Sequence, residues 1–143
     1  MKPKYWIIVA SKDHVENGLA EGIAQACHGK ASSLKRMQKD DLVLFYSGKM
    51  TLGKPDKCQE FTAIGKVKDD ELFQFEMSPD FNPFRRRISF IPSTEVYILP
   101  LINDLDFIEN KKYWGYPFRF GFFEIKQHDF DLISTKMLQQ THV

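Results

Sequence analysis

The sequence contains few cysteines, almost no net charge and no long apolar run. Cys27 and Cys58 are the only cysteines among 143 residues, and they form no C-x-x-C pair of the kind that binds zinc or exchanges disulfides. The formal net charge is +1, whereas a protein that coats nucleic acid through non-specific phosphate contacts is usually far more basic. No segment approaches the about 20 apolar residues of a membrane-spanning helix. We therefore expect a soluble cytoplasmic protein with no membrane partner, in which a local patch or pocket holds any nucleic acid.

Aromatic residues, by contrast, are abundant. They make up 14% of the chain and include thirteen Phe, a composition that favours a β-rich fold because rings pack well on pleated surfaces. With 43% hydrophobic and 27% charged residues, the chain fits one globular domain with a sizeable core. We expect a single domain over residues 1–143, with a monomer favoured.

The pattern of apolar residues predicts short strands interrupted by short helices. The continuous apolar run Tyr5–Ala10 is typical of a buried strand, and Ser11 precedes a short helix as its N-cap. The loop 23–30 is rich in small residues, and a terminal amphipathic helix is expected over 128–137. Together these elements predict an α+β fold with a curved or barrel-like mixed sheet of about six strands and short flanking helices. The other expected strands or extended segments cover 42–46, 59–67, 72–76, 84–91 and 96–100, the other helical segments 31–37 and 101–108, and a further loop 47–57.

The segment 113–125 holds seven aromatic residues, two glycines and one arginine. As a strand it carries rings on both faces of the pleat, which is more than one core surface needs. One interpretation is a doubly buried strand after a turn at 115–117. The other is that part of the segment stacks on a flat ligand such as a nucleobase. We assign Trp114, Phe118 and Arg119 to the ligand, and Phe120, Phe122, Phe123 and Ile125 to the strand and the core.

Catalytic motifs are incomplete. His14-Val15-Glu16 matches the H-x-E half of zinc-dependent nucleobase deaminases, but the P-C-x-x-C half that supplies two zinc ligands is missing. Cys27 and His28 are adjacent, and adjacent side chains seldom point at each other, so a polar loop is favoured over a nucleophile and its base. Gly29-Lys30 lacks the first glycine and the hydroxyl of a P-loop. We therefore expect no catalytic residue, no metal and no cofactor.

Basic residues cluster in two places. Arg85, Arg86 and Arg87 lie in one expected strand, so at most two of them share a face, where they would either bind phosphates or protect a sheet edge. The expected helix 31–37 carries cations that form either a solvated face or the rim of a basic groove. The residues that we assign to the nucleic-acid backbone are Lys35, Arg36, Arg85 and Arg87.

In the order and spacing of several segments, the chain resembles the EVE domain family of the PUA-like superfamily. The resemblance implies a PUA-like pseudo-barrel and a relation to YTH domains, which hold a methylated adenine in an aromatic cage. EVE domains are thought to bind modified nucleobases in DNA or RNA. One departure is Asp40, where the family usually has glycine before an aspartate that here is Asp41. The departure leaves the geometry of this turn open, because a positive φ is uncommon at residues other than glycine, although Asp is among the tolerated types. The matching segments are 4–11, His28-Gly29-Lys30, 34–37, Tyr46-Ser47, 59–65, 114–121, 123–125 and Asp129-Phe130.

These observations predict a non-catalytic nucleic-acid-binding module that recognises a modified base, in either DNA or RNA. Aromatic rings would form the pocket, and polar side chains with the backbone around Gly29 would bind the base edge. A small-molecule or enzymatic site in the same pocket is the alternative, and a protein-interaction adaptor is a third possibility. The residues assigned to ligand binding are Trp6, Ser11, Lys12, Gln25, His28, Gly29, Lys30, Tyr46, Ser47, Trp114, Phe118 and Arg119.

Overall fold

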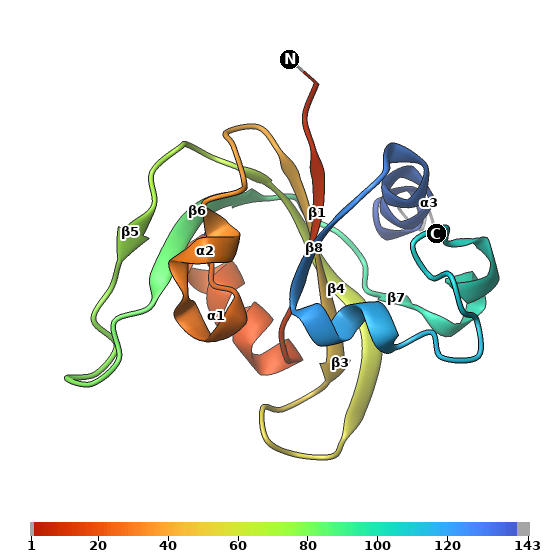
Figure 1. Ribbon diagram of the computed structural model, residues 1–143, viewed down its shortest axis with the longest axis horizontal. Coiled ribbons are helices and arrows are strands. Elements are labelled where there is room, and N and C mark those ends of the chain that lie inside the picture. Colours follow the sequence, from red (N-terminus) through yellow and green to blue (C-terminus); the bar gives the residue numbers. More distant parts are fainter. Residues whose placement is uncertain (1, 140–143) are drawn as a thin grey trace.

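The computed structural model describes residues 2–139, in which one strongly curved sheet forms the centre of the molecule (Figure 1). Its strand order is β2-β6-β4-β3-β1-β8, with β5 paired to β6 and β7 paired to β4. Six strands on this path, with short helices around them, confirm the predicted α+β class and the curved mixed sheet. The strands are β1 Tyr5–Val9, β2 Ile23–Ala24, β3 Leu42–Lys49, β4 Lys57–Val67, β5 Phe73–Gln74, β6 Phe84–Phe90, β7 Val96–Tyr97 and β8 Phe122–Ile125.

Strand β1 lies in the interior of the sheet, as its continuous apolar run predicts. It pairs in parallel with β3 and antiparallel with β8. Parallel neighbours require a long crossover, and residues 10–41 make it with α1 Lys12–Glu21, β2, the 3-10 turn η1 Cys27–Gly29 and α2 Ala31–Leu34. Side chains of β1 alternate between the two faces, so Trp6 and Ile8 enter one core cluster and Ile7 the other.

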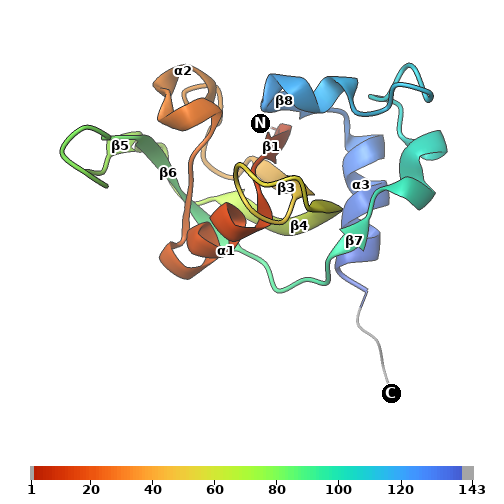
Figure 2. The ribbon, with the colours of Figure 1, turned by 90° about the horizontal axis from the view of Figure 1, so that it is seen from below.

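Helices cover the two faces of the sheet separately. Figure 2 shows α1 and α2 on one side of the central strands and α3 Gln127–Met137 on the other. The second side also carries the 3-10 segments η2 Leu99–Asp104 and η3 Tyr116–Phe120. The predicted terminal helix is confirmed, because Phe130, Ile133 and Met137 of α3 are buried. The helices of the crossover therefore cover one face of the sheet, and the cavity described below lies on this face.

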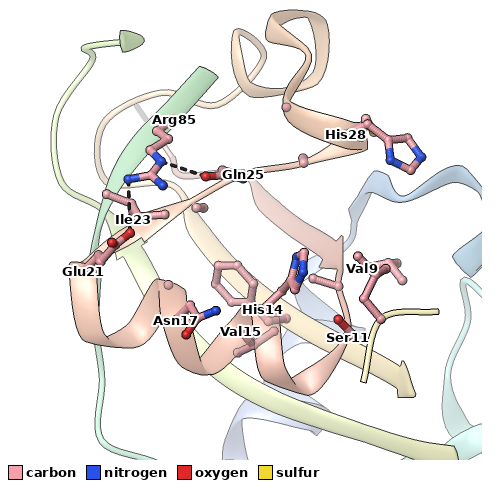
Figure 3. A pocket seen from close by; sticks show the side chains of 18 of the residues that line it. Val9, Ser11, His14, Val15, Asn17, Glu21, Ile23, Gln25, His28 and Arg85 are labelled. Atoms are coloured by element: carbon pink, nitrogen blue, oxygen red, sulfur yellow. Dashed lines mark hydrogen bonds and ion pairs between the residues drawn. The ribbon is translucent and has the colours of Figure 1, made fainter. Parts of the chain in front are cut away.

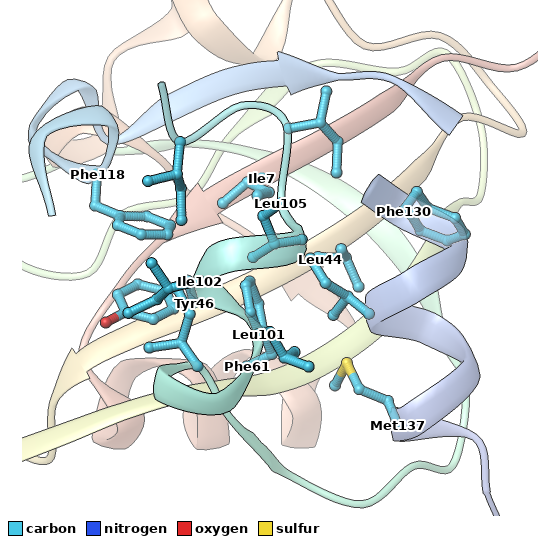
Figure 4. Close-up of a cluster of buried hydrophobic side chains, with 14 of the residues drawn as sticks. Ile7, Leu44, Tyr46, Phe61, Leu101, Ile102, Leu105, Phe118, Phe130 and Met137 are labelled. Carbon is cyan, nitrogen blue, oxygen red and sulfur yellow. The ribbon is translucent and has the colours of Figure 1, made fainter. Parts of the chain in front are cut away.

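On the face of the sheet that η2, η3 and α3 cover, buried hydrophobic side chains pack into one closed cluster (Figure 4). The ring of Phe118 stacks on that of Tyr46, with 3.9 Å between centroids. Ile7 and Leu44 are fully buried between these rings and α3. Burial raises the pKa of the Tyr46 phenol well above its ordinary value, because an ionised phenolate would lose its hydration there.

The aromatic segment 113–125 is not one continuous strand, which corrects the prediction. Residues 116–120 form the 3-10 turn η3, with Pro117 near its start, and Gly121 has a φ of 73° before β8 begins. Proline fixes φ in the helical range and suits the first turn of a helix. Phe118 and Phe120 therefore do not share a face, and Phe118 is buried while Phe120 is 59% exposed.

Gly65 lies where β4 and β6 approach each other closely. The pairing of β3 with β4 is regular at Gly65, and its register shifts at Thr62 of β4, between the pairs Phe45–Ala63 and Tyr46–Phe61, and again beyond Ser47. A Cβ atom on Gly65 would lie 2.5 Å from Cγ2 of Ile88, so glycine is needed for the close approach of β4 and β6. Strand β3 also continues to Lys49, further than predicted. Asp40 has a φ of 74°, so the turn keeps a left-handed residue although glycine is absent.

Candidate functional site

A cavity of about 600 Å³ lies between α1, the segment 23–29 and the β5–β6 arm, which we define as residues 73–85 (Figure 3). The cavity is hereafter called the α1 cavity. Its volume falls within the range of small-molecule sites, about 300–1,000 Å³. Apolar walls come from Val15, Phe45, Phe81 and Phe90. Polar side chains on its lining are Ser11, His14, Asn17, Glu21, Gln25 and His28, together with Arg85.

Three consecutive residues at one end of the cavity have left-handed backbone conformations. Cys27, His28 and Gly29 have φ angles of 50°, 61° and 80°. Two of them carry side chains, and such conformations cost about 1–2 kcal/mol each. Gly29 packs closely against the arm, because a Cβ atom there would lie 2.5 Å from Cβ of Pro83. The tertiary structure thus holds this strained turn against the arm, with its residues on the cavity lining.

Arg85 is buried beside the cavity and already has partners. Its Nε donates to Oε1 of Gln25 at 2.7 Å, and its Nη1 pairs with Oε2 of Glu21 at 3.1 Å. The guanidinium also lies over the ring of Phe75, 4.2 Å from the centroid. With only 4% of its surface exposed, Arg85 does not face solvent as a backbone phosphate contact requires, which corrects its predicted placement.

The hydroxyl of Ser11 faces the cavity with its proton already donated. Its Oγ donates to Oδ1 of Asp13, and this hydrogen bond, followed by one from the backbone N–H of His14, lowers the pKa of Asp13. The ionised carboxylate can only accept, so the hydroxyl must donate to it. Ser11 therefore offers only lone pairs to a ligand.

The comparison with known families decides the relationship of the chain. The sequence model of the EVE domain matches residues 4–136. The chain belongs to the EVE domain family. A UPF0310 protein of Mycolicibacterium vanbaalenii is 46% identical over 136 residues, which are 95% of this chain and 94% of that protein. The UPF0310 protein YdcG of Bacillus subtilis is 37% identical over 137 residues, 96% and 94% of the two chains.

Solved structures share the fold of this EVE domain at low sequence identity. The NMR structure of Rpa0253 from Rhodopseudomonas palustris has a TM-score of 0.58 and 14% identity, and the match covers 98% of each chain. A hypothetical protein from Leishmania major has a TM-score of 0.56 and 10% identity, with 94% of each chain covered. These likenesses concern the fold, and with the family match they confirm the expected PUA-like architecture.

The structure brings together the predicted polar edge of the site. Ser11, Gln25, His28 and Gly29 all line the α1 cavity, although they come from the end of β1 and from a segment more than ten residues further along the chain. Their contact with a ligand stays a prediction. Lys30 follows directly but is not part of the cavity lining, because it turns outward as the residue before α2.

The predicted aromatic wall lies elsewhere, in the two cores. Trp6 is 1% exposed, stacks on Phe122 and donates its Nε1–H to Asp41. Tyr46 and Phe118 stack on each other in the other cluster. These rings bury apolar area against one another, and none of them lines the α1 cavity, which corrects their placement. Ser47 is likewise fully buried and bonds Thr62.

Trp114 and Arg119 also lie outside the cavity lining. Trp114 is partly buried and packs edge-on against Phe118 at 6.4 Å between centroids. Arg119 is exposed on η3 above the ring of Tyr116. Lys12 pairs with Glu95 at 2.9 Å, and the hydrogen bond in this pair raises the pKa of its ammonium.

The three consecutive arginines have separate structural roles. Arg86 is 2% exposed and donates to the carbonyl oxygens of Leu34, Met37 and Asp69, which ties β6 to the end of α2. Burial lowers the pKa of Arg86. Arg87 is partly exposed and pairs with Glu71 at 3.1 Å, and this hydrogen bond raises its pKa. The predicted phosphate-binding face at Arg85 and Arg87 therefore has carboxylate partners within the protein.

Sequence reasoning missed the contribution of α1 to the site. His14, Asn17 and Glu21 line the cavity at helical spacings of three and four, on the side that also carries the buried Val15 and Gly18. The periodicity of polar residues next to apolar ones was the available signal. The only sequence motif that contains His14 is the incomplete deaminase motif.

A second group of charged residues comes together away from the cavity. Oxygen atoms of Asp106 and Asp129 lie 3.2 and 3.1 Å from Nδ1 of His128. Both oxygens of the buried Asp129 accept backbone N–H groups, from Asp106 and Phe107. The carboxylate therefore joins the loop after η2 to the start of α3 and has its hydrogen bonds supplied by the chain itself.

None of the described helices is long and apolar enough to cross a bilayer.

Proposed function

We propose that this EVE domain is a non-catalytic nucleic-acid-binding module that admits a modified base, in DNA or RNA, into the α1 cavity. The observation that supports the proposal is the combination of apolar walls with polar groups of both kinds on one cavity of base size. Phe45 and Phe90 supply ring surface on one side. Gln25 and the histidines supply hydrogen-bonding groups on the other. A base taken out of a stack is bound through these two kinds of contact.

The surroundings of the η1 turn suit a single strand that continues past the bound base. Lys30, Lys35 and Arg36 are exposed at α2, and within the described residues none of them lies within ion-pair distance of a carboxylate. On the other side of the turn, Sγ of Cys27 lies 3.8 Å from the carbonyl oxygen of Phe120, so the exposed rings of η3 are its neighbours. Cations would bind phosphates and exposed rings would stack flanking bases.

The contacts of Cys27 support a binding role over nucleophilic catalysis. Its thiol lies 3.3 Å from Oγ of Ser33, and activation of a thiol requires a base or a cation within hydrogen-bond reach. His28 is exposed at the adjacent position of the turn. An enzymatic or small-molecule site in the same cavity stays the alternative.

The direct test is equilibrium binding of dye-labelled single-stranded oligonucleotides, DNA and RNA, with a single methylated cytosine or methylated adenine and their unmodified parents. We expect one modified strand to bind about 10-fold or more tightly than its parent, the discrimination that a good set of base contacts provides. His14→Ala should reduce this preference. Glu16→Ala is the matched control, because Glu16 is exposed on the same helix outside the cavity lining.

Two outcomes would contradict the proposal. If no modified strand is preferred over its parent, base recognition is excluded for the modifications tested. If the free modified nucleoside binds as tightly as the strand that carries it, the small-molecule alternative is favoured.

The contacts with the strand have a test of their own. The Lys35→Ala variant should bind every sequence more weakly by a similar factor, and its binding should depend less on salt concentration.

A further inference from the structure

The amide of Gln25 has an orientation that chemistry fixes. Its side chain is held 2.7 Å from Nε of Arg85. Because a guanidinium has only donors, the amide group that faces it must be the oxygen and not the nitrogen. The reversed amide would set two donors against each other and leave both without a partner.

Arg85 is itself prevented from turning away. It is 4% exposed, pairs with Glu21 through Nη1 and covers the ring of Phe75. Figure 3 shows Glu21, Arg85 and Gln25 joined in a row along one side of the cavity. Arg85 thus acts as a positioning residue for the Gln25 amide.

The nitrogen of that amide, Nε2, is the group left for a ligand. Gln25 lies on the cavity lining, and within residues 2–139 no protein acceptor bonds its Nε2. The Nε2 group carries two N–H donors and no acceptor. We propose that Gln25 determines the specificity of the α1 cavity, selecting ligands with a hydrogen-bond acceptor, an unprotonated ring nitrogen or a carbonyl oxygen, at the β2 edge. This inference rests on the proposed function and specifies which base edge is read.

The selectivity follows from the cost of a mismatch. A ligand that presents C–H at this edge leaves the Gln25 donors without a partner, and one that presents N–H also leaves its own donor without one. Sites of this kind discriminate strongly against the wrong group. The amide cannot rotate to offer its oxygen without breaking its hydrogen bond to Arg85. An unconstrained glutamine would accept either kind of edge.

Gln25→Glu tests the donor role directly. Glutamate keeps an oxygen for Arg85 to bind but replaces both N–H donors with an acceptor. We expect the affinity for the preferred modified strand to fall by about 10-fold or more, with an unchanged melting temperature. Gln127→Glu is the matched control, because Gln127 begins α3 outside the cavity lining and undergoes the same change of charge.

Analogues of the bound base separate reading from a structural effect. The probes are the preferred strand and versions in which the modified base has one ring nitrogen replaced by C–H, or one carbonyl replaced by thiocarbonyl, a weaker acceptor. Wild-type protein should lose about 10-fold with one analogue. The Gln25→Ala variant should bind that analogue and the preferred modified base equally. Once the side chain that makes the contact is removed, loss of the matching group on the base has no further effect.

Three results would overturn the inference, each in a different way. Equal wild-type affinity for the base and all its analogues shows that no acceptor is read. Unchanged binding by Gln25→Glu shows that the amide nitrogen makes no contact. In both cases recognition of a modified base survives, whereas absence of any binding by the wild-type protein removes the proposed function and the role of Gln25 together.

Discussion

The two faces of the sheet are built from similar residues and have opposite characters. On the face of η2, η3 and α3, rings pack on rings, as Phe118 does on Tyr46, and the cluster is closed. On the face of α1 and α2, the core around Trp6 is equally tight, but a cavity remains beyond it, between α1 and the segment 23–29. The crossover of residues 10–41 thus contributes side chains both to the core and to the lining of the cavity.

The difference shows that a high density of aromatic residues is a poor guide to a ligand site. Rings on the closed face use their surfaces on each other. The cavity has fewer rings, but it has polar groups with free hydrogen-bonding capacity and a strained turn held against the arm. Free hydrogen-bonding capacity beside apolar surface is what a binding site needs, and strain is commonly retained at such sites.

The largest expected effect comes from Trp6, the residue that most clearly belongs to the core. Trp6→Ala should lower the free energy of unfolding by about 3–5 kcal/mol, since it leaves a large void next to Phe122 and removes one donor to the buried Asp41. Urea unfolding measures this. A loss of ligand binding with unchanged stability would instead show that Trp6 contacts the ligand.

Gly29→Ala tests the strained turn at the cavity. The substitution should cost about 1–3 kcal/mol of stability, because the φ of 80° disfavours alanine and the new methyl group meets Pro83. Gly53→Ala is the control, with a φ of 78° and no atom within 4 Å of the added Cβ. The difference in lost stability between the two variants measures the effect of the contact between the new methyl group and the arm. Equal losses would show that the arm moves aside at no cost.

Trp114→Ala distinguishes the two faces by ligand binding. Trp114 is partly buried against the closed cluster, so we expect a loss of about 1–2 kcal/mol of stability. Binding of the preferred oligonucleotide should stay as in the wild type, measured under conditions in which both proteins are folded. Loss of binding without loss of stability would place Trp114 in the interface, as the sequence alone indicates.

The two cysteines report on the two environments through their reactivity. Burial, together with Glu60, raises the pKa of the Cys58 thiol to about 11, so about one molecule in a thousand carries the thiolate at pH 8. Cys27 is partly exposed on the cavity lining. Iodoacetamide should modify Cys27 about 10-fold faster or more, and a bound ligand should protect it. Faster modification of Cys58, read by mass spectrometry, would contradict this arrangement.

The smallest expected effect concerns Asp13 at the start of α1. Its pKa is lower in the folded protein, so its contribution to stability is present above about pH 4 and is lost as the pH falls through the folded pKa. Asp13→Asn should cost about 0.5 kcal/mol or less at pH 7, because solvent screens the group. The two proteins should become equally stable in acid. A difference in urea midpoint that grows on acidification would contradict the assigned sign.

Much of the fold follows from local patterns. The apolar run 5–10 gives an interior strand, and the spacing of Phe130, Ile133 and Met137 gives α3, because burial of these side chains agrees with the local preference. The prediction of one continuous strand over 113–125 is wrong, because Pro117 and Gly121 direct the chain into a 3-10 turn before β8. The predicted placement of Trp6, Tyr46 and Phe118 around a ligand is wrong for another reason. Neighbouring rings compete for the same core, and sequence does not show which of them find partners there.

The sequence by itself determined the class of fold, the buried strands and the polar segment 23–30, most of which lines the α1 cavity. Only the tertiary structure decided that Trp6, Tyr46 and Phe118 face inward, and that Arg85 is buried behind Gln25 rather than displayed to phosphate. The physical reason is that local propensity acts between neighbours in the chain. The partner of a ring, a guanidinium or an amide comes from an element far away in sequence, and that partner fixes what each group has left to offer a ligand.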